Sequence, residues 1–237
     1  MTQIRYSAST HVGLKRKVNE DSILALPDQR IWVVADGMGG HEGGDFSSQA
    51  VVDSVAMIDP TLPPVGLLHA LRDTLARSHE LILKESEARG GLTMGTTVVT
   101  FAIAEDHFAT FWAGDSRLYR LQGGVLDMLT TDHSVVAAFV MAGEMTWDEA
   151  EHHPQSNAVT RAVGVGDELE LEKIRGEILP GDRFLLCSDG LTKYATFGIL
   201  ERVLSEEPIE TVTERLQQIA LDGGGADNIS IIVIDVI

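Results

Sequence analysis

The chain has 237 residues, of which 44% are hydrophobic and 23% are charged, a composition typical of a globular protein with a sizeable core. Its formal net charge is −18, from 36 acidic and 18 basic residues, so its surface repels nucleic-acid phosphates and anionic lipid heads. We therefore expect no nucleic-acid partner and no membrane association.

The compartment is indicated by the cysteine content and by the hydropathy. Cys187 is the only cysteine, so no internal disulfide can form and a reducing compartment is expected. Residues 1–13 contain no apolar core of the signal-peptide type, and no apolar run approaches the length of about 18 residues that a membrane helix needs. The prediction is a cytoplasmic protein.

The first half of the chain is predicted to form strands and then two helices. Residues 4–8 alternate between apolar and polar side chains, as a half-buried strand does. Residues 31–35 form a continuous apolar run, typical of a buried strand, which ends in the glycine-rich stretch 36–40. One helix is expected from about Asp45, and a second from Pro64, a favoured residue for a first helical turn. The second helix would bury one face, made of Leu68, Leu71, Leu75 and Ile82.

Strand patterns return after the second helix. Residues 96–104 and 107–113 are predicted to pair, and 117–121 and 125–129 flank a glycine-rich hairpin turn at 122–124.

The last third of the chain mixes both patterns. Helical spacing is predicted for 134–151, strict alternation predicts a strand with one wet face at 168–172, and 183–187 is a buried strand. The remaining expected elements are helices at 197–204 and 209–221 and a strand at 229–236. Because strands and helices do not alternate regularly, an α+β fold with antiparallel sheets is favoured over a doubly wound parallel sheet.

Several carboxylates lie at the ends of these predicted strands. Asp36 and Asp189 each end a buried strand, and Asp227 precedes the last one. Each adjoins a glycine or asparagine turn, which lets the backbone approach a ligand closely. Asp115 and the pair at 20–21 occupy similar places. If these ends converge, the crowded carboxylates need cations, and Mg²⁺ or Mn²⁺ suits oxygen ligands better than Zn²⁺. The alternative for any single aspartate is a turn-forming or helix-capping role, because spacing alone does not establish convergence.

Eight short motifs occur in one order along the chain. They are RKVNED at 16–21, DGMGG at 36–40, MGTT at 94–97, GDSR at 114–117, DHS at 132–134, NAVTRAVG at 157–164, SDGL at 188–191 and DNIS at 227–230. This series resembles the motifs of bacterial metal-dependent serine/threonine protein phosphatases of the PPM (PP2C-like) family, over roughly residues 5–236.

The resemblance implies a four-layer α-β-β-α sandwich, in which two antiparallel sheets are flanked by helices. It also implies a single catalytic domain over residues 1–237, with a flap at about 135–165 beside the site. The flap either contributes to substrate choice or is a helical hairpin that simply packs.

The resemblance further implies a site for two core ions, Mn²⁺ or Mg²⁺, and a third, weaker one. Asp36 would bridge the core ions, and Asp115 would share the third ion with Asp189. The implied ligands are Asp36, the Gly37 carbonyl, Asp189, Asp227, Asp115 and, through a water molecule, Glu20.

The implied chemistry is hydrolysis by an activated water without a covalent phosphoenzyme. Arg16 would hold the substrate phosphate, because a guanidinium fork matches an oxyanion, and together with the ions on Asp36 it would neutralise the transition state. Cys187 is expected to be a core residue and not a nucleophile. Many eukaryotic relatives have a histidine where this chain has Met38, so the general acid is unassigned, with His41 as a nearby alternative.

The resemblance implies phosphorylated proteins as substrates and an opposing Hanks-type kinase. It also extends to family members encoded beside type VI secretion systems. We also expect a monomer. Two alternatives are weighed against this function. A phosphoprotein-binding pseudophosphatase would have lost a metal aspartate or Arg16, and none is lost. A hydrolase of small phosphoesters stays open, since a metal site recognises only the phosphate.

Overall fold

The computed structural model describes residues 3–237, apart from the side chains of residues 41 and 42. The side chain of His41, the alternative general acid, therefore lies outside the described part. Within that part, no helix combines the length and the apolar character needed to cross a membrane.

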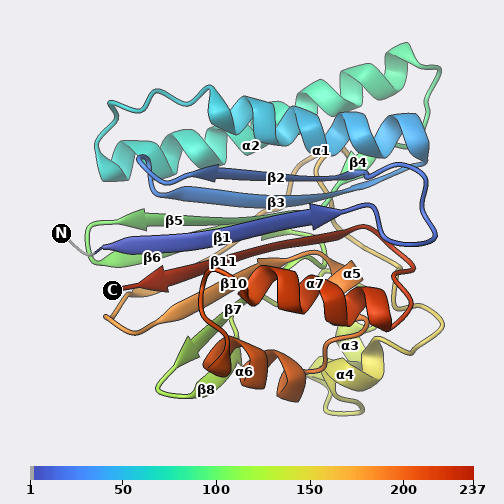
Figure 1. The fold of residues 1–237 in the computed structure, drawn as a ribbon. Helices are drawn as coiled ribbons and strands as arrows, with labels where there is room; N and C mark the ends of the chain where they lie inside the picture. The colour runs from blue at the N-terminus through green and yellow to red at the C-terminus, as the bar shows by residue number, and fades with distance from the viewer. Residues whose placement is uncertain (1–2) are drawn as a thin grey trace.

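Two antiparallel sheets lie in the middle of the molecule (Figure 1). The first sheet has the strand order β1 (Ile4–His11), β11 (Ile229–Val236), β10 (Arg183–Cys187), β7 (Arg117–Gln122) and β8 (Val125–Met128). The second has the order β2 (Asp21–Leu26), β3 (Ile31–Met38), β5 (Val98–Ala104), β6 (His107–Ala113) and β9 (Glu172–Glu177), with β4 (Gly95–Thr96) paired to β3.

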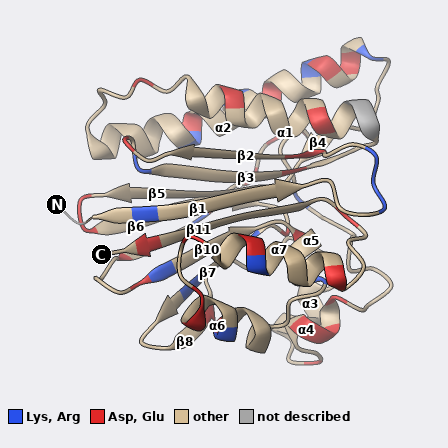
Figure 2. Cartoon of the chain, viewed as in Figure 1, with Lys and Arg blue, Asp and Glu red and all other residues tan. Residues whose placement is uncertain are grey.

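Helices cover the outer faces of both sheets (Figure 1). The second sheet is covered by α1 (His41–Ala56) and α2 (Pro64–Ala88), and the first by α5 (Asp189–Thr192), α6 (Phe197–Glu206) and α7 (Val212–Asp222). Two short helices, α3 (Ala137–Met141) and α4 (Trp147–Ala150), lie in the flap between β8 and β9. The layers confirm the predicted α-β-β-α sandwich. Figure 2 shows acidic residues on the outer helices with fewer basic residues among them, in keeping with the net charge of −18.

The core has three layers, and strand β3 shows why. Because side chains alternate along a strand, Ile31 and Val33 pack against α1 and α2, whereas Trp32 faces the other sheet. Between the sheets, the Phe101 ring lies 6.1 Å from Trp32 and 4.5 Å from Phe184, centroid to centroid. A strand buried on both faces needs a continuous apolar run, which is the pattern seen in the sequence.

One predicted strand is wrong. The ladder of β9 begins at Glu172, opposite Trp112 of β6, so residues 168–171 lie outside the sheet. Their alternation has a different cause, because Leu169 and Leu171 are partly buried against the core under α1 and α2. An alternating pattern indicates that one side of a segment is buried, but it does not by itself show that a partner strand is present.

Other differences concern boundaries. Helix α1 begins at His41, four residues before the predicted Asp45, and its first turn contains two glycines. The predicted strand 96–104 is divided at Thr97 into β4 and β5. The predicted helical stretch 134–151 contains only the short helices α3 and α4. On α2, Leu68 is only partly buried.

Candidate active site

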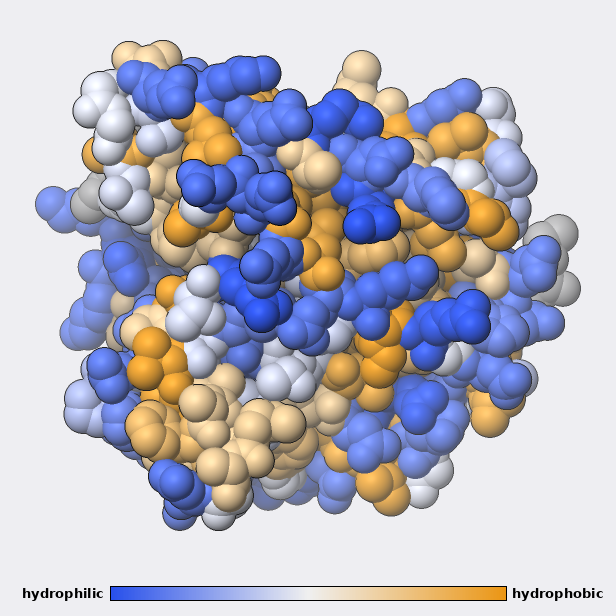
Figure 3. All heavy atoms as spheres, turned by 180° about the vertical axis from the view of Figure 1, so that it is seen from behind, coloured by the Kyte–Doolittle hydropathy of each residue, from blue (hydrophilic) through white to orange (hydrophobic). Residues whose placement is uncertain are grey.

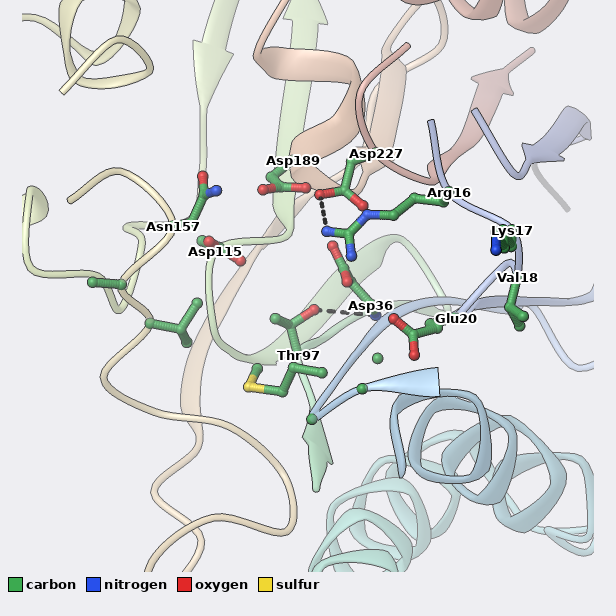
Figure 4. A pocket seen from close by; sticks show the side chains of 16 residues that line it. Arg16, Lys17, Val18, Glu20, Asp36, Thr97, Asp115, Asn157, Asp189 and Asp227 are labelled. Carbon is green, nitrogen blue, oxygen red and sulfur yellow. Dashed lines mark hydrogen bonds and ion pairs between the residues drawn. The ribbon is translucent and has the colours of Figure 1, made fainter. Parts of the chain in front are cut away.

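A cavity of about 460 Å³ opens at the end of the sandwich where β3 and β10 end and β11 begins (Figure 4). It is lined by side chains from several loops that are far apart in sequence. The lining residues are Arg16, Lys17, Val18, Glu20, Asp36, Gly37, Met38, Gly39, Gly40, Thr97, Asp115, Asn157, Ala158, Val159, Asp189 and Asp227. Arg16 and all six of the implied metal ligands, from Glu20 to Asp227, are in this set.

The carboxylates reach the cavity from the ends of strands. Asp36 lies near the end of β3, Asp189 begins α5 directly after β10, and Asp227 lies just before β11. Figure 4 shows the side chains of these three aspartates pointing into the same space. Asp115 and Glu20 complete a group of five carboxylates, whereas only two of the described lining residues, Arg16 and Lys17, are cationic. The structure therefore brings together strand-end carboxylates whose convergence the sequence spacing alone did not establish.

The crowding raises the pKa values of these acids. The pKa of Asp36 lies well above its ordinary value, because of burial and then the charges of Asp21 and Asp189. Burial and the neighbouring Asp189 also hold the pKa of Asp115 well above the usual range. Burial and the charge of Asp227 raise the pKa of Asp189 to about 6. Without a compensating cation, the folded chain thus penalises the charged forms.

Asp21 is a site residue that sequence reasoning noted but did not assign. It lies opposite Asp36 in the β2–β3 ladder, and its Oδ2 accepts a 2.8 Å hydrogen bond from Ser188 Oγ. Burial raises the pKa of Asp21 to about 7. Its Oδ1 is buried and has no hydrogen-bond partner, and the same holds for Oε1 of Glu20. The adjacent acids Glu20 and Asp21 marked this region in the sequence, but the pairing of β2 with β3 was needed to place Asp21 opposite Asp36.

Position 37 leaves no room for a side chain, because two other backbone segments lie close to it. A Cβ at Gly37 would lie 2.2 Å from the carbonyl oxygen of Gly44 and 2.5 Å from that of Glu20, both backbone atoms. The Gly37 amide also donates a 3.1 Å hydrogen bond to the Glu20 carbonyl. The glycine thus lets the Glu20 loop and the first turn of α1 pack directly against the end of β3, beside Asp36.

Asn228 fixes the loop that carries Arg16, and sequence reasoning missed this role. Its Oδ1 accepts a 2.8 Å hydrogen bond from the Glu20 amide. Its Nδ2 donates to the carbonyl oxygens of Val12 and Val18 at 2.9 and 3.1 Å. All three partners are more than 200 positions away along the chain, so no local pattern in the sequence could reveal them.

A hydroxyl pair connects the two sheets at the site. The Asp36 amide donates to Thr97 Oγ1 at 3.2 Å (Figure 4). That oxygen shares a 2.7 Å hydrogen bond with Ser116 Oγ, next to Asp115. The turn before Asp115 is held from its other side, because the Gly114 amide donates to Nδ1 of His133 at 3.1 Å. These contacts fix the backbone positions of two of the cavity carboxylates.

Arg16 is placed in the cavity but is paired with a carboxylate. Its Nη2 lies 2.8 Å from Oδ2 of Asp227, and its side chain is 49% exposed (Figure 4). The hydrogen bond to Asp227 is the main reason why the pKa of Arg16 is raised. The guanidinium is therefore charged and accessible, as an anion-binding group must be.

The donor set fits divalent ions with oxygen ligands. Carboxylates in excess of cations, with buried oxygens that lack partners, suit Mg²⁺ or Mn²⁺ and not a sulfur-bound or nitrogen-bound metal. In the described part of the chain, no three His, Cys, Asp or Glu side chains are already arranged as ligands of one ion. Asp227 shows one reason, since its carboxylate is turned to Arg16.

Two further residues bear on the chemistry. Met38, which stands where the resemblance would place the histidine of many eukaryotic relatives, lines the cavity, and none of the described lining residues is a histidine or a cysteine. Cys187 is fully buried in the core between β10 and α5–α7, and burial raises the pKa of its thiol well above the usual range. These properties match the predicted role of Cys187 as a core residue.

Comparison with known proteins gives consistent results. The sequence profile of the protein phosphatase 2C family matches residues 14–229. The serine/threonine protein phosphatase PstP of Mycobacterium tuberculosis is 36% identical over 235 residues, which are 99% of this chain and 45% of PstP. The chain thus spans about half the length of this curated relative. The protein phosphatase PhpP of Streptococcus pneumoniae is 35% identical, with 96% of each chain covered.

Solved structures agree with these relatives. PppA, described as a key regulatory component of the type VI secretion system in Pseudomonas aeruginosa, has a TM-score of 0.92 and 43% identity, covering 99% of this chain and 98% of its own. The catalytic domain of PstP in complex with two manganese ions has a TM-score of 0.90 and 34% identity, with both chains fully covered.

Proposed function

Since the chain belongs to the protein phosphatase 2C family, we propose that it is a metal-dependent phosphatase that hydrolyses phosphoserine and phosphothreonine in proteins. The observation that carries the proposal is the convergence of five carboxylates and Arg16 on one cavity of about 460 Å³. The relatives named above support the same activity, because those with curated names are protein phosphatases.

We propose Mn²⁺ or Mg²⁺ as the cofactor, with two core ions and a third. The structure of PstP with two manganese ions supports this choice, as does the oxygen-only donor set of the cavity. The ligands proposed are Asp36, the Gly37 carbonyl, Asp189, Asp227, Asp115 and, through a water molecule, Glu20. The ions, when bound, supply Lewis acidity that makes a neighbouring water nucleophilic near neutral pH.

The chain's own residues would bind and orient the phosphoryl group. The Arg16 guanidinium would donate to the phosphate oxygens and stabilise the charge that develops on them. Because Arg16 already binds Asp227 at 2.8 Å, its position is partly fixed before substrate arrives. The lack of histidine and cysteine among the described lining residues supports direct attack by water over a phosphoenzyme on either residue type.

Asp21 would act by position and not by contact with substrate. It is buried beside Asp36, and its carboxylate is held by Ser188. A negative charge there would strengthen the attraction of the cavity for cations. The orphaned Oδ1 of Asp21 would be available as a hydrogen-bond acceptor beside the residues that would hold the ions.

The finer biological assignments are also proposals. We propose that the chain opposes a serine/threonine kinase and acts in a type VI secretion circuit, as the similarity to PppA supports. We also propose a monomer in a reducing, cytoplasmic setting, and the buried, unpaired Cys187 supports the reducing setting. Figure 3 shows mainly hydrophilic residues on the face opposite to Figure 1, with hydrophobic ones in scattered patches, as expected for a monomer.

The direct experiment is phosphate release from a phosphothreonine peptide, compared with a panel of small phosphoesters, in Mn²⁺ and in excess EDTA. The proposal predicts hydrolysis of the peptide that stops in EDTA. Preference for small phosphoesters would favour the alternative hydrolase. If folded protein binds the phosphopeptide but releases no phosphate in either Mn²⁺ or Mg²⁺, the pseudophosphatase alternative is correct instead.

A further inference from the structure

Arg117 is a buried cation that the phosphoryl chemistry proposed above does not use. It lies at the start of β7, two residues after Asp115, and its side chain is only 6% exposed. Its Nε and Nη2 donate to the two carboxylate oxygens of Asp132 at 2.9 and 2.7 Å, in a bidentate pair. Its Nη1 lies 2.8 Å from Oε1 of Glu151.

The same guanidinium is in contact with the flap (residues 135–165). Glu151 follows α4 directly, and Trp147 begins that helix. The Arg117 guanidinium carbon lies 5.1 Å from the centroid of the Trp147 ring, within range of a cation–π contact. Arg117 thus joins three groups: the first sheet, Asp132 at the base of the flap, and α4 within the flap.

The far part of the flap forms one wall of the catalytic cavity. Asn157, Ala158 and Val159 all line that cavity. Backbone hydrogen bonds connect this wall to α4, from the His153 amide to the Ala150 carbonyl at 3.0 Å and from the Ser156 amide to the His153 carbonyl at 2.9 Å. A displacement of α4 would therefore be transmitted to the wall.

The contacts of Arg117 lie next to the proposed metal site. A second, small cavity is lined by Asp115 and Asp189 of the proposed metal site, by Arg117 and Glu151, and by Asn157 of the wall. The wall lies against the metal site at the place where Arg117 holds the flap. Arg117 is therefore not simply a remote packing residue.

The electrostatics make this attachment strong but sensitive. The side chains of Asp132 and Glu151 are 3% and 12% exposed, so two nearly buried carboxylates depend on one buried cation. Removing one partner of such a group leaves an uncompensated buried charge, which is strongly destabilising. The low local dielectric strengthens the contacts as long as all members are present.

Other contacts also hold the flap, and one chain of them reaches the turn before Asp115, because the Thr160 amide donates to the His133 carbonyl at 2.7 Å and the His133 amide donates to the Gly114 carbonyl at 2.9 Å. The base of the flap is held by the paired backbone groups of Val163 and Thr96, at 2.9 and 2.8 Å. The Phe197 amide at the start of α6 donates to Asp148 Oδ1 at 3.1 Å. Among the contacts described for α4, the one made by Arg117 joins this helix to the strand that follows Asp115 of the proposed metal site.

We propose that Arg117 is a positioning residue, whose buried guanidinium latches the flap to β7 and so fixes the cavity wall of Asn157, Ala158 and Val159 for the protein part of a phosphoprotein substrate. The consequence for activity rests on the proposed function, whereas the latch itself does not. The latch should affect substrates that reach the wall, and it should leave small phosphoesters almost unaffected.

The test uses Glu151→Gln, because Arg117 variants leave two buried carboxylates unpaired and are expected to unfold. The glutamine keeps the shape and removes the charge on the flap side of the latch. The readout is hydrogen exchange of the backbone amides of Ala150 and Glu151, with amides of β11 as an internal reference. We expect exchange in α4 to be faster by about ten-fold, equivalent to about 1.4 kcal/mol of local opening, with β11 unchanged.

The matched control is Glu144→Gln, which removes the same charge from an exposed position of the flap and should leave exchange in α4 unchanged. A second variant, Trp147→Leu, removes the cation–π contact and should also accelerate exchange in α4. Unchanged exchange in both latch variants would overturn the proposal. Equal acceleration in β11 would also overturn it, because Glu151 would then support only global stability.

The kinetic readout separates positioning from general structure. At saturating Mn²⁺, Glu151→Gln should raise KM for a phosphothreonine peptide about three-fold or more, with kcat/KM for p-nitrophenyl phosphate within about two-fold of wild type. An equal loss for both substrates would contradict the assigned role of the wall. If the wild type hydrolyses neither substrate, the proposed function fails, while the exchange measurement still decides whether the latch exists.

Discussion

Gly37→Ala is the perturbation that the geometry of the site defines most sharply. The new methyl group would lie 2.2 Å from the carbonyl oxygen of Gly44 and 2.5 Å from that of Glu20. Ordinary contacts of this kind are longer by about 1 Å or more, and neither oxygen belongs to a side chain that can rotate away. The end of β3 and the loop at Glu20 must therefore separate.

The structure gives the expected magnitude. Overpacking a tight site costs about 1–3 kcal/mol, and the upper value applies here because two backbone segments must move. For a chain of 237 residues, a loss of about 3 kcal/mol corresponds to a decrease in Tm of roughly 6–12 °C. A displacement on the order of 1 Å beside Asp36 should also reduce phosphate release about a hundred-fold.

Differential scanning fluorimetry and phosphate release in Mn²⁺ measure both effects. The matched control is Gly198→Ala on α6, where a Cβ would meet no atom within 4 Å. An alanine inside a helix should leave Tm unchanged or raise it slightly, with full activity. If Gly37→Ala retained the wild-type Tm and activity, the close backbone approach at Gly37 would not be a constraint on the site.

Two further predictions concern charge. Arg16→Lys keeps the positive charge but loses the fork, so kcat/KM for a phosphopeptide should fall about ten-fold in steady-state assays, mainly through KM; an unchanged KM would contradict phosphate binding by Arg16. The metal-free chain should lose stability as pH rises from about 4 to 7. In the unfolded chain the carboxylates have a pKa of about 4, whereas in the folded chain burial raises the pKa of Asp189 to about 6 and that of Asp21 to about 7. Ionising these groups therefore costs more free energy in the folded state than in the unfolded state. Since bound Mn²⁺ favours the ionised forms, thermal unfolding with and without Mn²⁺ should show a gain in Tm that grows with pH, and a gain independent of pH would refute this.

The sequence predicted the fold well wherever one buried face or an abrupt end marked an element. The apolar run 31–35 and its glycine-rich end placed β3 and Asp36 correctly, because a strand buried on both faces has few alternative patterns. The strand predicted at 168–172 is wrong because one buried face does not guarantee a partner strand. Leu169 and Leu171 do face the core, but β6 offers its ladder only from Glu172 onward.

The start of α1 shows a different limit. Two glycines in its first turn made the sequence pattern unlike a helix, although a Cβ at Gly44 would lie 2.9 Å from the backbone carbon of Gly37. A tertiary contact therefore determines the residue type, against helix propensity. Local pattern reading has no access to such a contact.

The site was predictable as a set of candidates but not as a set of contacts. The strand-end positions of Asp36, Asp189 and Asp227 marked them as candidates without establishing that they converge, and the structure brings them together. The roles of Asn228 and Arg117 depend on partners that strand pairing and loop packing supply. No spacing in the sequence specifies those partners.

The most direct measurement for the central claim is phosphate release from a phosphothreonine peptide by the wild type and by Asp36→Asn, each in Mn²⁺ and in excess EDTA. Because burial and neighbouring carboxylates raise the pKa of Asp36, a neutral amide there should not unfold the chain, which circular dichroism can verify. We predict activity that requires Mn²⁺ and falls at least about a hundred-fold in the variant. Activity that survives EDTA, or that Asp36→Asn retains in full, would contradict metal-dependent hydrolysis at this cavity.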